Sequence, residues 1–331
     1  MSNPEKLKLS KDHGLKAIAF SVARVPNTMK VFFGCQDFKV YETDLAAMKV
    51  EPKELYTHGS YVTGVALAGK TLVSGGYDCK LTWFDTDTKR EIRSGEAHAK
   101  WIRGVFASPD GNLVASVADD MVCKLWDAYS GKLVNELRGH AEKTPHGFGS
   151  MLYAAAFSAD GKYIATADKI GKTMIWEVAS GKKLAEVEAP IMYTWDQAQR
   201  LHSIGGIRSV AFSPDGKTIA VGGTGKIGNI DHLEAKGRIE LFDWATQKRL
   251  AEYVSDKQGI VNHLEYSPDG SWIVGAGGAG EGFLVFIDAA GKKTIKSEKA
   301  GMHVHDLLFT EKQETLIAVG HNKLAVYEMK G

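Results

Sequence analysis

The sequence contains little cysteine, no surplus of charge of one sign and no long apolar run. Its 331 residues include only three cysteines, Cys35, Cys79 and Cys123, without CxxC spacing. This argues for reduced thiols rather than a disulfide framework or a cysteine metal site. The 41 basic residues nearly equal the 40 acidic ones, so nucleic acid and acidic membranes are not expected as partners. No apolar run reaches the ~18 residues that span a bilayer, and residues 1–14 lack the apolar core of a secretory signal. We therefore predict a cytoplasmic protein.

Common catalytic signatures are also missing. Neither GxSxG nor HExxH occurs, and acidic residues fall mostly in turns. The pair His303 and His305, with His321 nearby, could ligate a metal. However, His303 lies near a position that recurs as a structural Gly-His in the repeat described below. We therefore predict no catalytic residue, no metal site and no cofactor.

What the chain does contain is a repeated phrase. The stretch "CKLWDAYSGK" at 123–132 places an aromatic residue and an acid at the end of an apolar run, before a turn. Similar phrases recur, most of them about 40–45 residues apart, which is the length of a four-stranded propeller blade. Seven aromatic residues mark the copies: Tyr41, Phe84, Trp126, Trp176, Phe242, Phe286 (or Ile287 in its place) and Tyr327.

A second motif has the same period. "SPDG" occurs at 108–111, 213–216 and 267–270, and "SADG" at 158–161, each between two short runs typical of strands. Proline presets φ and glycine accepts a positive φ, so this motif predicts a tight hairpin turn. Each repeat therefore reads as strands separated by turns, and a unit of this kind needs neighbours to bury its faces.

These motifs resemble those of the WD-repeat β-propeller family. The resemblance rests on Leu-Trp-Asp at 125–127, Gly-His at 139–140 and the Ser-Pro-Asp-Gly turns, and it covers essentially the whole chain. It implies an all-β fold, a single seven-bladed propeller of four-stranded antiparallel blades over residues 1–331. The turn style, with few Gly-His pairs, looks more bacterial than eukaryotic.

In this family a His, a Ser or Thr, an Asp and a Trp form a buried hydrogen-bonded set. Repeat 3 matches this pattern with His98, Ser116, Asp120 and Trp126. Repeat 2 has His58, Ser74 and Asp78, but Phe84 replaces the Trp. Repeat 4 keeps His140, Thr166 and Trp176, while Ile170 occupies the Asp position. The other repeats depart further, so their blades are expected to depend on apolar packing.

The last repeat lacks sequence for a fourth strand. An open sheet edge invites aggregation, and a spare segment, "EKLKLSKD", precedes the first repeat. We therefore predict that residues 5–10 supply the missing strand beside 323–328 and close the ring.

Two glycine-rich stretches fit a dinucleotide-binding fingerprint. They are "GTGKIG" at 223–228 and "GAGGAG" at 275–280, and Asp243 lies at the spacing of a ribose-binding acid. Both fall at the same position of the repeat, where turn glycines are expected. Antiparallel hairpins also deny the fingerprint its parallel βαβ unit. A phosphate loop is excluded because Ala220 and Ile227 occupy two of its required positions.

We expect function to lie in the segments that make some repeats longer than the others. Three insertions, 141–150, 188–206 and 224–237, belong to one face over blades 4 and 5, and loops on a rigid scaffold carry function. Aromatic and Arg side chains are the usual binding anchors. The predicted partner-binding residues here are His146, Phe148, Tyr193, Trp195, Arg200, His202 and His232. The alternative is that Tyr193 and Trp195 fold inward and pack the long loop onto the blades.

The family resemblance adds three residues at the start of first strands on the same face. These are Tyr61 and Trp101, with Tyr77 just before Asp78; packing between blades would explain them equally well. We therefore predict a non-catalytic scaffold that binds a protein or peptide of unidentified sequence. The alternatives are a propeller enzyme, hydrolytic or metal-dependent, or a small-ligand binder that uses this face or the axial channel.

Overall fold

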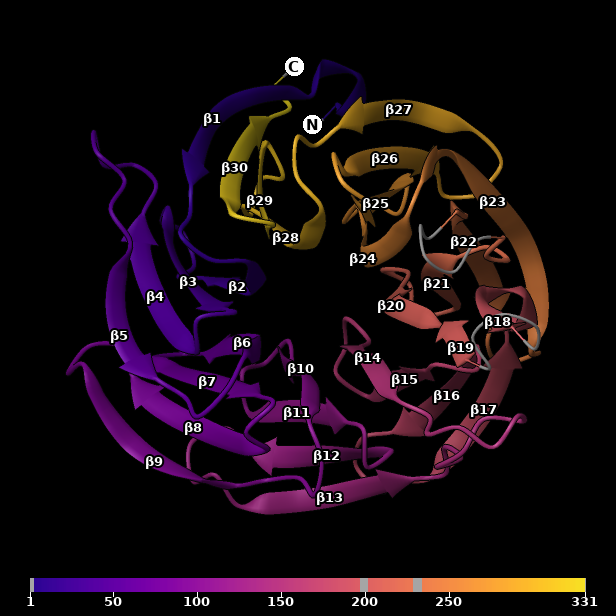
Figure 1. Ribbon diagram of the computed structural model, residues 1–331, viewed down its shortest axis with the longest axis horizontal. Coiled ribbons are helices and arrows are strands. Elements are labelled where there is room, and N and C mark those ends of the chain that lie inside the picture. The colour runs from indigo at the N-terminus through magenta and orange to yellow at the C-terminus, as the bar shows by residue number, and fades with distance from the viewer. Residues whose placement is uncertain (1–2, 197–201, 229–233, 331) are drawn as a thin grey trace. The chain divides into compact units, whose positions relative to one another are not determined.

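The chain folds almost entirely into β-strands. The computed structural model describes residues 3–196, 202–228 and 234–330, and the only helices in that part are two short 3-10 turns, η1 (Pro4–Lys6) and η2 (Pro190–Met192). The strands form seven four-stranded antiparallel sheets and one two-stranded sheet (Figure 1). The seven larger sheets are the blades of a seven-bladed β-propeller, as predicted from the repeat.

The first four blades follow the chain in order. Blade 1 consists of β2 (Ala19–Arg24), β3 (Lys30–Cys35), β4 (Lys39–Asp44) and β5 (Lys53–Thr57). Blade 2 consists of β6 (Val62–Ala68), β7 (Thr71–Gly76), β8 (Lys80–Asp85) and β9 (Arg90–Glu96). Blade 3 consists of β10 (Ile102–Ala107), β11 (Leu113–Ala118), β12 (Val122–Asp127) and β13 (Leu133–Arg138). Blade 4 consists of β14 (Leu152–Phe157), β15 (Tyr163–Asp168), β16 (Lys172–Glu177) and β17 (Lys183–Glu188).

The remaining blades come after a two-stranded hairpin. The hairpin consists of β18 (Tyr193–Asp196) and β19 (His202–Gly205). Blade 5 consists of β20 (Ile207–Phe212), β21 (Thr218–Thr224), β22 (Lys236–Asp243) and β23 (Lys248–Gln258). Blade 6 consists of β24 (Ile260–Tyr266), β25 (Trp272–Gly278), β26 (Phe283–Asp288) and β27 (Thr294–Lys299). Blade 7 consists of β28 (Val304–Phe309), β29 (Thr315–Gly320), β30 (Lys323–Glu328) and β1 (Lys8–Gly14).

The chain divides into two compact units. The first comprises residues 1–116, 126–134 and 304–331, and the second comprises residues 117–125 and 135–303. Each has its own apolar clusters. One cluster of the first unit packs Val31 and Phe33 against Ile317 and Val326. In the second unit, a cluster packs side chains of blade 4 against those of blade 5, among them Ile175 and Phe242.

The Ser-Pro-Asp-Gly motif forms the predicted hairpin turn. In blade 3, Asp110 Oδ1 accepts two hydrogen bonds. One comes from the Ser108 hydroxyl at 2.6 Å and the other from the Asn112 N–H at 3.0 Å. These hydrogen bonds lower the pKa of Asp110 below its ordinary value. Gly111 has a φ of 70°, a conformation that favours glycine. The motif therefore fixes the connection between β10 and β11 through its own side chains.

The N-terminal segment completes blade 7, though with other bounds than expected. Strand β1 (Lys8–Gly14) pairs antiparallel with β30, from Lys8 opposite Glu328 to Gly14 opposite Lys323 (Figure 1, indigo beside yellow). The prediction placed this strand at residues 5–10. It begins later because Pro4 starts η1, capped by Asn3 Oδ1, which accepts from the Glu5 N–H at 3.0 Å. The pairing partner was predicted correctly, and the bounds were wrong.

The glycine-rich stretch at 223–228 connects antiparallel strands. Thr224, at the end of β21, lies opposite Gly237 of β22 in an antiparallel ladder. A dinucleotide fingerprint needs a parallel βαβ unit at this point. Strand β25, which leads into the second glycine-rich stretch, is likewise antiparallel to β26. The structure therefore places both stretches at the ends of antiparallel strands and in the connections that follow them.

Candidate functional site

Three hydrogen-bonded sets join the connection that follows the outer strand of one blade to the next blade. In blade 4, the Trp176 indole N–H donates to Thr166 Oγ1 at 2.8 Å, and Thr166 Oγ1 lies 2.8 Å from His140 Nε2. His140 Nδ1 donates to Asp168 Oδ2 at 2.7 Å. All four side chains are buried. The expectation that Ile170 leaves this set without its acid is therefore wrong, because Asp168 supplies the carboxylate from two residues earlier.

The set predicted for blade 3 contains the same kind of contacts. The Trp126 indole N–H donates to Ser116 Oγ at 2.9 Å, and Ser116 Oγ lies 2.7 Å from His98 Nε2. Asp120 accepts from the backbone N–H of Val122 at 3.2 Å. Trp126 is 9% exposed and meets Trp83 edge to face, with ring centroids 6.0 Å apart. The hydroxyl of Ser116 therefore links an indole to an imidazole inside the protein.

Blade 2 fills the missing tryptophan position in a way that the sequence did not reveal. His58 Nδ1 donates to Asp78 Oδ2 at 3.0 Å, and His58 Nε2 lies 2.7 Å from Ser74 Oγ. Burial alone would raise the pKa of Asp78, but the hydrogen bonds from His58 and from the Gly59 N–H lower it. The hydroxyl of Tyr56, on β5, lies 2.9 Å from Ser74 Oγ, and its ring stacks on Phe84 at 4.6 Å. Tyr56 and Phe84 together thus replace one tryptophan.

We predict that Tyr56→Phe lowers the free energy of unfolding by about 1 kcal/mol, the net value of a typical hydrogen bond. The ring and its stacking on Phe84 are retained, while the bond to Ser74 is lost. Urea denaturation measures the change. Tyr253→Phe is the matched control, since its hydroxyl lies 2.8 Å from Thr294 Oγ1 at an exposed site and surface changes usually stay within about 0.5 kcal/mol. Equal stability of Tyr56→Phe and wild type would contradict the role of Tyr56.

The Asp-His-Ser order in blade 2 resembles a hydrolytic triad, but it lacks an accessible nucleophile. Ser74 has no exposed surface, and its hydroxyl is already shared between His58 and Tyr56. A nucleophile must reach a substrate carbonyl. The same holds in blades 3 and 4, where Ser116 and Thr166 also have no exposed surface. In this structure, therefore, none of these three hydroxyls is accessible to a substrate.

Two of the insertions meet in a cluster of rings that we call the aromatic clasp: His146, Phe148, Tyr193 and Trp195. The imidazole of His146 stacks on Trp195 at 4.8 Å and on Tyr193 at 5.7 Å. Phe148, from the first insertion, contacts Trp195 of the second, with ring centroids 5.0 Å apart. A hydrogen bond of 2.9 Å joins His146 Nδ1 to the Tyr193 hydroxyl. His146 is exposed, and the other three rings are partly exposed.

Local geometry explains why these rings meet. Tyr193 and Trp195 are two residues apart on β18, so they project from one side of the β18–β19 hairpin. Thr194 projects from the other side, where its Oγ1 accepts from the Ile227 N–H of the third insertion at 3.0 Å. The first insertion forms a tight turn, in which the Phe148 carbonyl accepts from the Thr144 N–H at 2.7 Å. The hairpin is thus fixed on one side and presents rings on the other.

Three predicted residues of this face cannot be placed in the clasp. Arg200 and His232 lie outside the described residues. His202 is described only as a member of β19, opposite Asp196. Their part in binding stays a prediction.

The first unit contains a second group of rings, which we call the aromatic row: Phe20, Tyr61, Tyr77 and Trp101. Neighbouring ring centroids are 6.0 Å, 5.5 Å and 4.4 Å apart along this order. Tyr77 and Trp101 are stacked within 6° of parallel. Phe38 lies beside Tyr61 at 5.7 Å. The three residues predicted from the family resemblance are therefore in contact, and the row extends beyond them.

The two ends of the row differ in chemistry. At one end the Arg103 guanidinium lies 4.9 Å from the ring centre of Tyr77 and 5.5 Å from that of Trp101, and it donates to the Tyr77 hydroxyl. At the other end His305 contacts Phe20 at 5.1 Å and His321 at 5.1 Å. Burial lowers the pKa of His321. Trp101 is 48% exposed and Phe38 is 39% exposed, so the row reaches solvent.

The sequence did not reveal that the first strand of six blades carries an irregularity near its start, at its second residue in five blades and at its third in blade 6. The ladder between first and second strands shifts register there. Irregularities of this kind redirect side chains next to functional sites. The residues at these positions are Phe20, Thr63, Tyr153, Arg208, Asn262 and His305. Two of these side chains meet: the Arg208 guanidinium lies over the Tyr153 ring, 3.6 Å from its centre.

The histidines considered as metal ligands have other contacts. His303 Nε2 lies 2.7 Å from Asn262 Nδ2, and the His305 ring contacts that of His321 at an interplanar angle of 34°. Within the described ranges, no group of three or more His, Cys, Asp or Glu residues is arranged to hold a metal ion. These contacts give no support to the HxH alternative.

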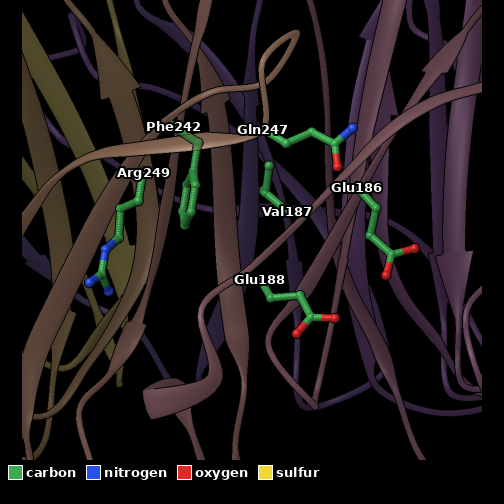
Figure 2. A pocket seen from close by; sticks show the side chains of 6 residues that line it. All are labelled: Glu186, Val187, Glu188, Phe242, Gln247 and Arg249. Atoms are coloured by element: carbon green, nitrogen blue, oxygen red, sulfur yellow. The ribbon is translucent and has the colours of Figure 1, made fainter.

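A pocket of about 440 Å³ lies in the second unit between β17 and the β22–β23 hairpin (Figure 2). Glu186 and Glu188 line it from β17, and Phe242, Gln247 and Arg249 line it from the β22–β23 hairpin. Lys172 Nζ donates to both glutamates, at 2.7 Å and 2.9 Å. Burial alone would raise the pKa of Glu186, but the bonds from Lys172 and Lys183 lower it. Arg249 lies 3.3 Å from Glu240. Most charges of this pocket thus already have partners.

Comparison with known proteins agrees with this geometry. The model of the family described as "WD domain, G-beta repeat" matches residues 89–127 and 197–227. These matches support a WD-repeat propeller. A guanine nucleotide-binding protein subunit beta-like protein of Encephalitozoon cuniculi is 24% identical over 279 residues, which cover 79% of this chain and 77% of the relative.

Two other relatives match a smaller share of this chain. Apoptotic protease-activating factor 1 of Rattus norvegicus is 29% identical over 157 residues, 47% of this chain and 12% of the relative. Nuclear distribution protein PAC1 of Arthroderma otae is 37% identical over 65 residues, 20% of this chain and 14% of the relative. The chain therefore matches only a small part of these longer relatives. No helix in the described ranges is long and apolar enough to cross a membrane.

Proposed function

We propose that this propeller is a non-catalytic scaffold that binds a protein or peptide on the face carrying the insertions 141–150, 188–206 and 224–237, over blades 4 and 5. The observation that carries the proposal is the aromatic clasp. Its rings come from two separate insertions, contact one another and remain partly exposed. A bacterial source and a cytoplasmic location belong to the same proposal.

The clasp has the properties of a binding hot spot. Aromatic anchors surrounded by polar groups dominate the energy of protein interfaces. Because Trp195 already contacts both His146 and Phe148, less side-chain entropy remains to be lost when a partner binds. A loop that served only to cover the blades would have no need to present these rings to solvent. The partial exposure therefore favours binding over the inward-packing alternative.

We predict that Trp195→Ala weakens partner binding by about 2 kcal/mol or more, roughly thirtyfold in Kd. Partners are captured with the wild-type protein and identified, and the affinity of each is then measured by titration calorimetry. Ile191→Ala is the matched control, because Ile191 lies in the same insertion and is 44% exposed but lies outside the clasp.

Melting curves show whether each variant remains folded. Full affinity of Trp195→Ala for every partner would overturn the proposal. Unfolding of Trp195→Ala would instead place this side chain in the core, which also contradicts it.

A further inference from the structure

We propose that the pocket between β17 and the β22–β23 hairpin binds a neutral phenol ring, of the kind that tyrosine carries. This site is separate from the proposed scaffold surface, because none of the residues that line the pocket belongs to the aromatic clasp. At the corresponding position of blade 1 the chain supplies a tyrosine of its own, whereas blade 4 has a valine there.

The strand register relates the pocket to Tyr56. In blade 1, Tyr56 of β5 lies opposite Val40, the second residue of β4. In blade 4, Val187 of β17 lies opposite Thr173, the second residue of β16. Val187 is therefore the counterpart of Tyr56.

The phenylalanines of the following blades correspond as well. Phe84 precedes the terminal aspartate of β8, and Phe242 precedes the terminal aspartate of β22. In the first unit, the Tyr56 ring stacks on Phe84 with centroids 4.6 Å apart. In the second unit, β17 contains no aromatic residue to play this part, and the pocket of about 440 Å³ is lined by both Val187 and Phe242. The pocket is therefore the counterpart of the space that a tyrosine ring fills beside Phe84.

The pocket offers apolar and planar groups to an aromatic ring (Figure 2). Val187 and Phe242 are largely buried, at 4% and 3% exposure, so they form an apolar base. Arg249 also lines the pocket, and its side chain is 49% exposed. A guanidinium plane stacks readily on an aromatic face. These three groups together suit a ring better than an aliphatic chain.

The charges around the pocket are balanced, which favours a neutral ligand. Lys172 and Lys183 balance Glu186 and Glu188, and the two arginines of β22 and β23 pair with two glutamates. An ionised carboxylate has about four acceptor positions, so the lining glutamates can still accept a hydrogen bond from a hydroxyl. A phenol combines an apolar ring with one such polar group.

Gln247 adds a further polar group to the pocket. Its side-chain amide has no hydrogen bond with the described residues. Its φ is 60°, at a turn position where blades 3 and 4 have Gly131 and Gly181. Lys89 occupies this position in blade 2 with a φ of 57°, and its ammonium pairs with Glu42. Because strained conformations persist where a side chain has a task, we assign the Gln247 amide to the ligand's hydroxyl.

The test uses the full chain and three amides: N-acetyltyrosinamide, N-acetylphenylalaninamide and N-acetylleucinamide. Saturation-transfer NMR measures the affinity of each amide, and valine-methyl NMR reports on the Val187 signals, assigned through Val187→Ile. The tyrosine amide should bind saturably and shift the Val187 signals. The other two should bind at least about threefold more weakly, as expected for the loss of one hydrogen bond.

A glycine-serine peptide with one central tyrosine distinguishes the two sources of a phenol. Tighter binding of the peptide than of the tyrosine amide would assign the pocket to a side chain of a partner protein. Tighter binding of the amide would assign it to a small phenol. Either result supports the chemistry proposed for the pocket.

Variants locate the binding in the pocket. Val187→Tyr should fill the pocket with the chain's own ring and abolish saturable binding, and Gln247→Gly should reduce the preference for the tyrosine amide over the phenylalanine amide. Leu184→Ala is the matched control, since Leu184 lies on the same strand and is 39% exposed but does not line the pocket. Trp195→Ala should bind the amide normally, which separates failure of this inference from failure of the proposed function.

Three outcomes would overturn the inference. They are no saturable shift of the Val187 signals with the tyrosine amide, equal affinity for the phenylalanine or leucine amide, and full binding by folded Val187→Tyr. Melting curves establish whether Val187→Tyr is folded. If it is not, Val187→Met provides the same test, because the flexible methionine side chain fills irregular space.

Discussion

Trp126→Ala is expected to lower the free energy of unfolding by about 3–5 kcal/mol, the usual cost of removing a large buried aromatic side chain. The indole packs edge to face against Trp83 and donates to Ser116. Removal of the indole leaves a cavity. The Ser116 hydroxyl also loses the indole N–H from which it accepts a hydrogen bond. Chemical denaturation followed by circular dichroism measures the change in stability.

Trp126→Phe separates the two contributions. Phenylalanine retains most of the apolar contact but cannot donate, so this variant should cost about 1–2 kcal/mol. Blade 2 shows how a phenylalanine at this position is tolerated, since the Tyr56 hydroxyl reaches Ser74 beside Phe84. A loss below about 1 kcal/mol for Trp126→Ala, the range of surface changes, would contradict its structural role.

Asp168→Ala is expected to be at least as damaging, with a loss of about 3–5 kcal/mol. The carboxylate has no exposed surface. It accepts from His140 at 2.7 Å, from the Ile170 N–H at 3.0 Å and from the Lys172 N–H at 2.9 Å. Alanine would leave the buried His140 donor and the two partly buried N–H groups without this acceptor, and each buried donor left unsatisfied costs roughly 1–3 kcal/mol.

Asp168→Asn is the matched control for this prediction. The asparagine side chain has the same shape as aspartate and keeps one oxygen that accepts hydrogen bonds. Asp168→Asn should therefore be more stable than Asp168→Ala. The melting temperatures of the two variants provide the measurement. If Asp168→Ala melts at the same temperature as the wild type, the set around His140 contributes little to the stability of blade 4.

The period of the sequence was enough to predict the blades, because hydrophobic spacing and turn chemistry are local properties. The Ser108–Gly111 turn shows this, since its side chains and one glycine fix the hairpin by themselves. The acid of blade 4 was missed for a geometric reason. Side chains two residues apart near a strand end project to the same side, so a carboxylate at position 168 reaches the histidine as one at position 170 would.

Contacts between strands distant in the sequence were less predictable. Tyr56 belongs to the outer strand of blade 1, and nothing in its own repeat indicates that its hydroxyl serves Ser74 of blade 2. The insertions were recognisable as candidate binding loops from their excess length. The stacking of His146 on Trp195, however, depends on how two loops fold toward each other. The pairing of Tyr77 with Trp101 needed the same spatial information.

The pairing of β1 with β30 has a consequence for the order of events during synthesis. Asp12 and Lys323 form an ion pair across 311 positions of sequence. At the usual ribosomal speed of about 5–20 residues per second, their codons are translated roughly 15–60 seconds apart. The N-terminal strand therefore emerges long before its partner, with its backbone groups unpaired in that sheet. During this interval a nascent-chain chaperone has an exposed strand to hold, and blade 7 can form only after β30 has been translated.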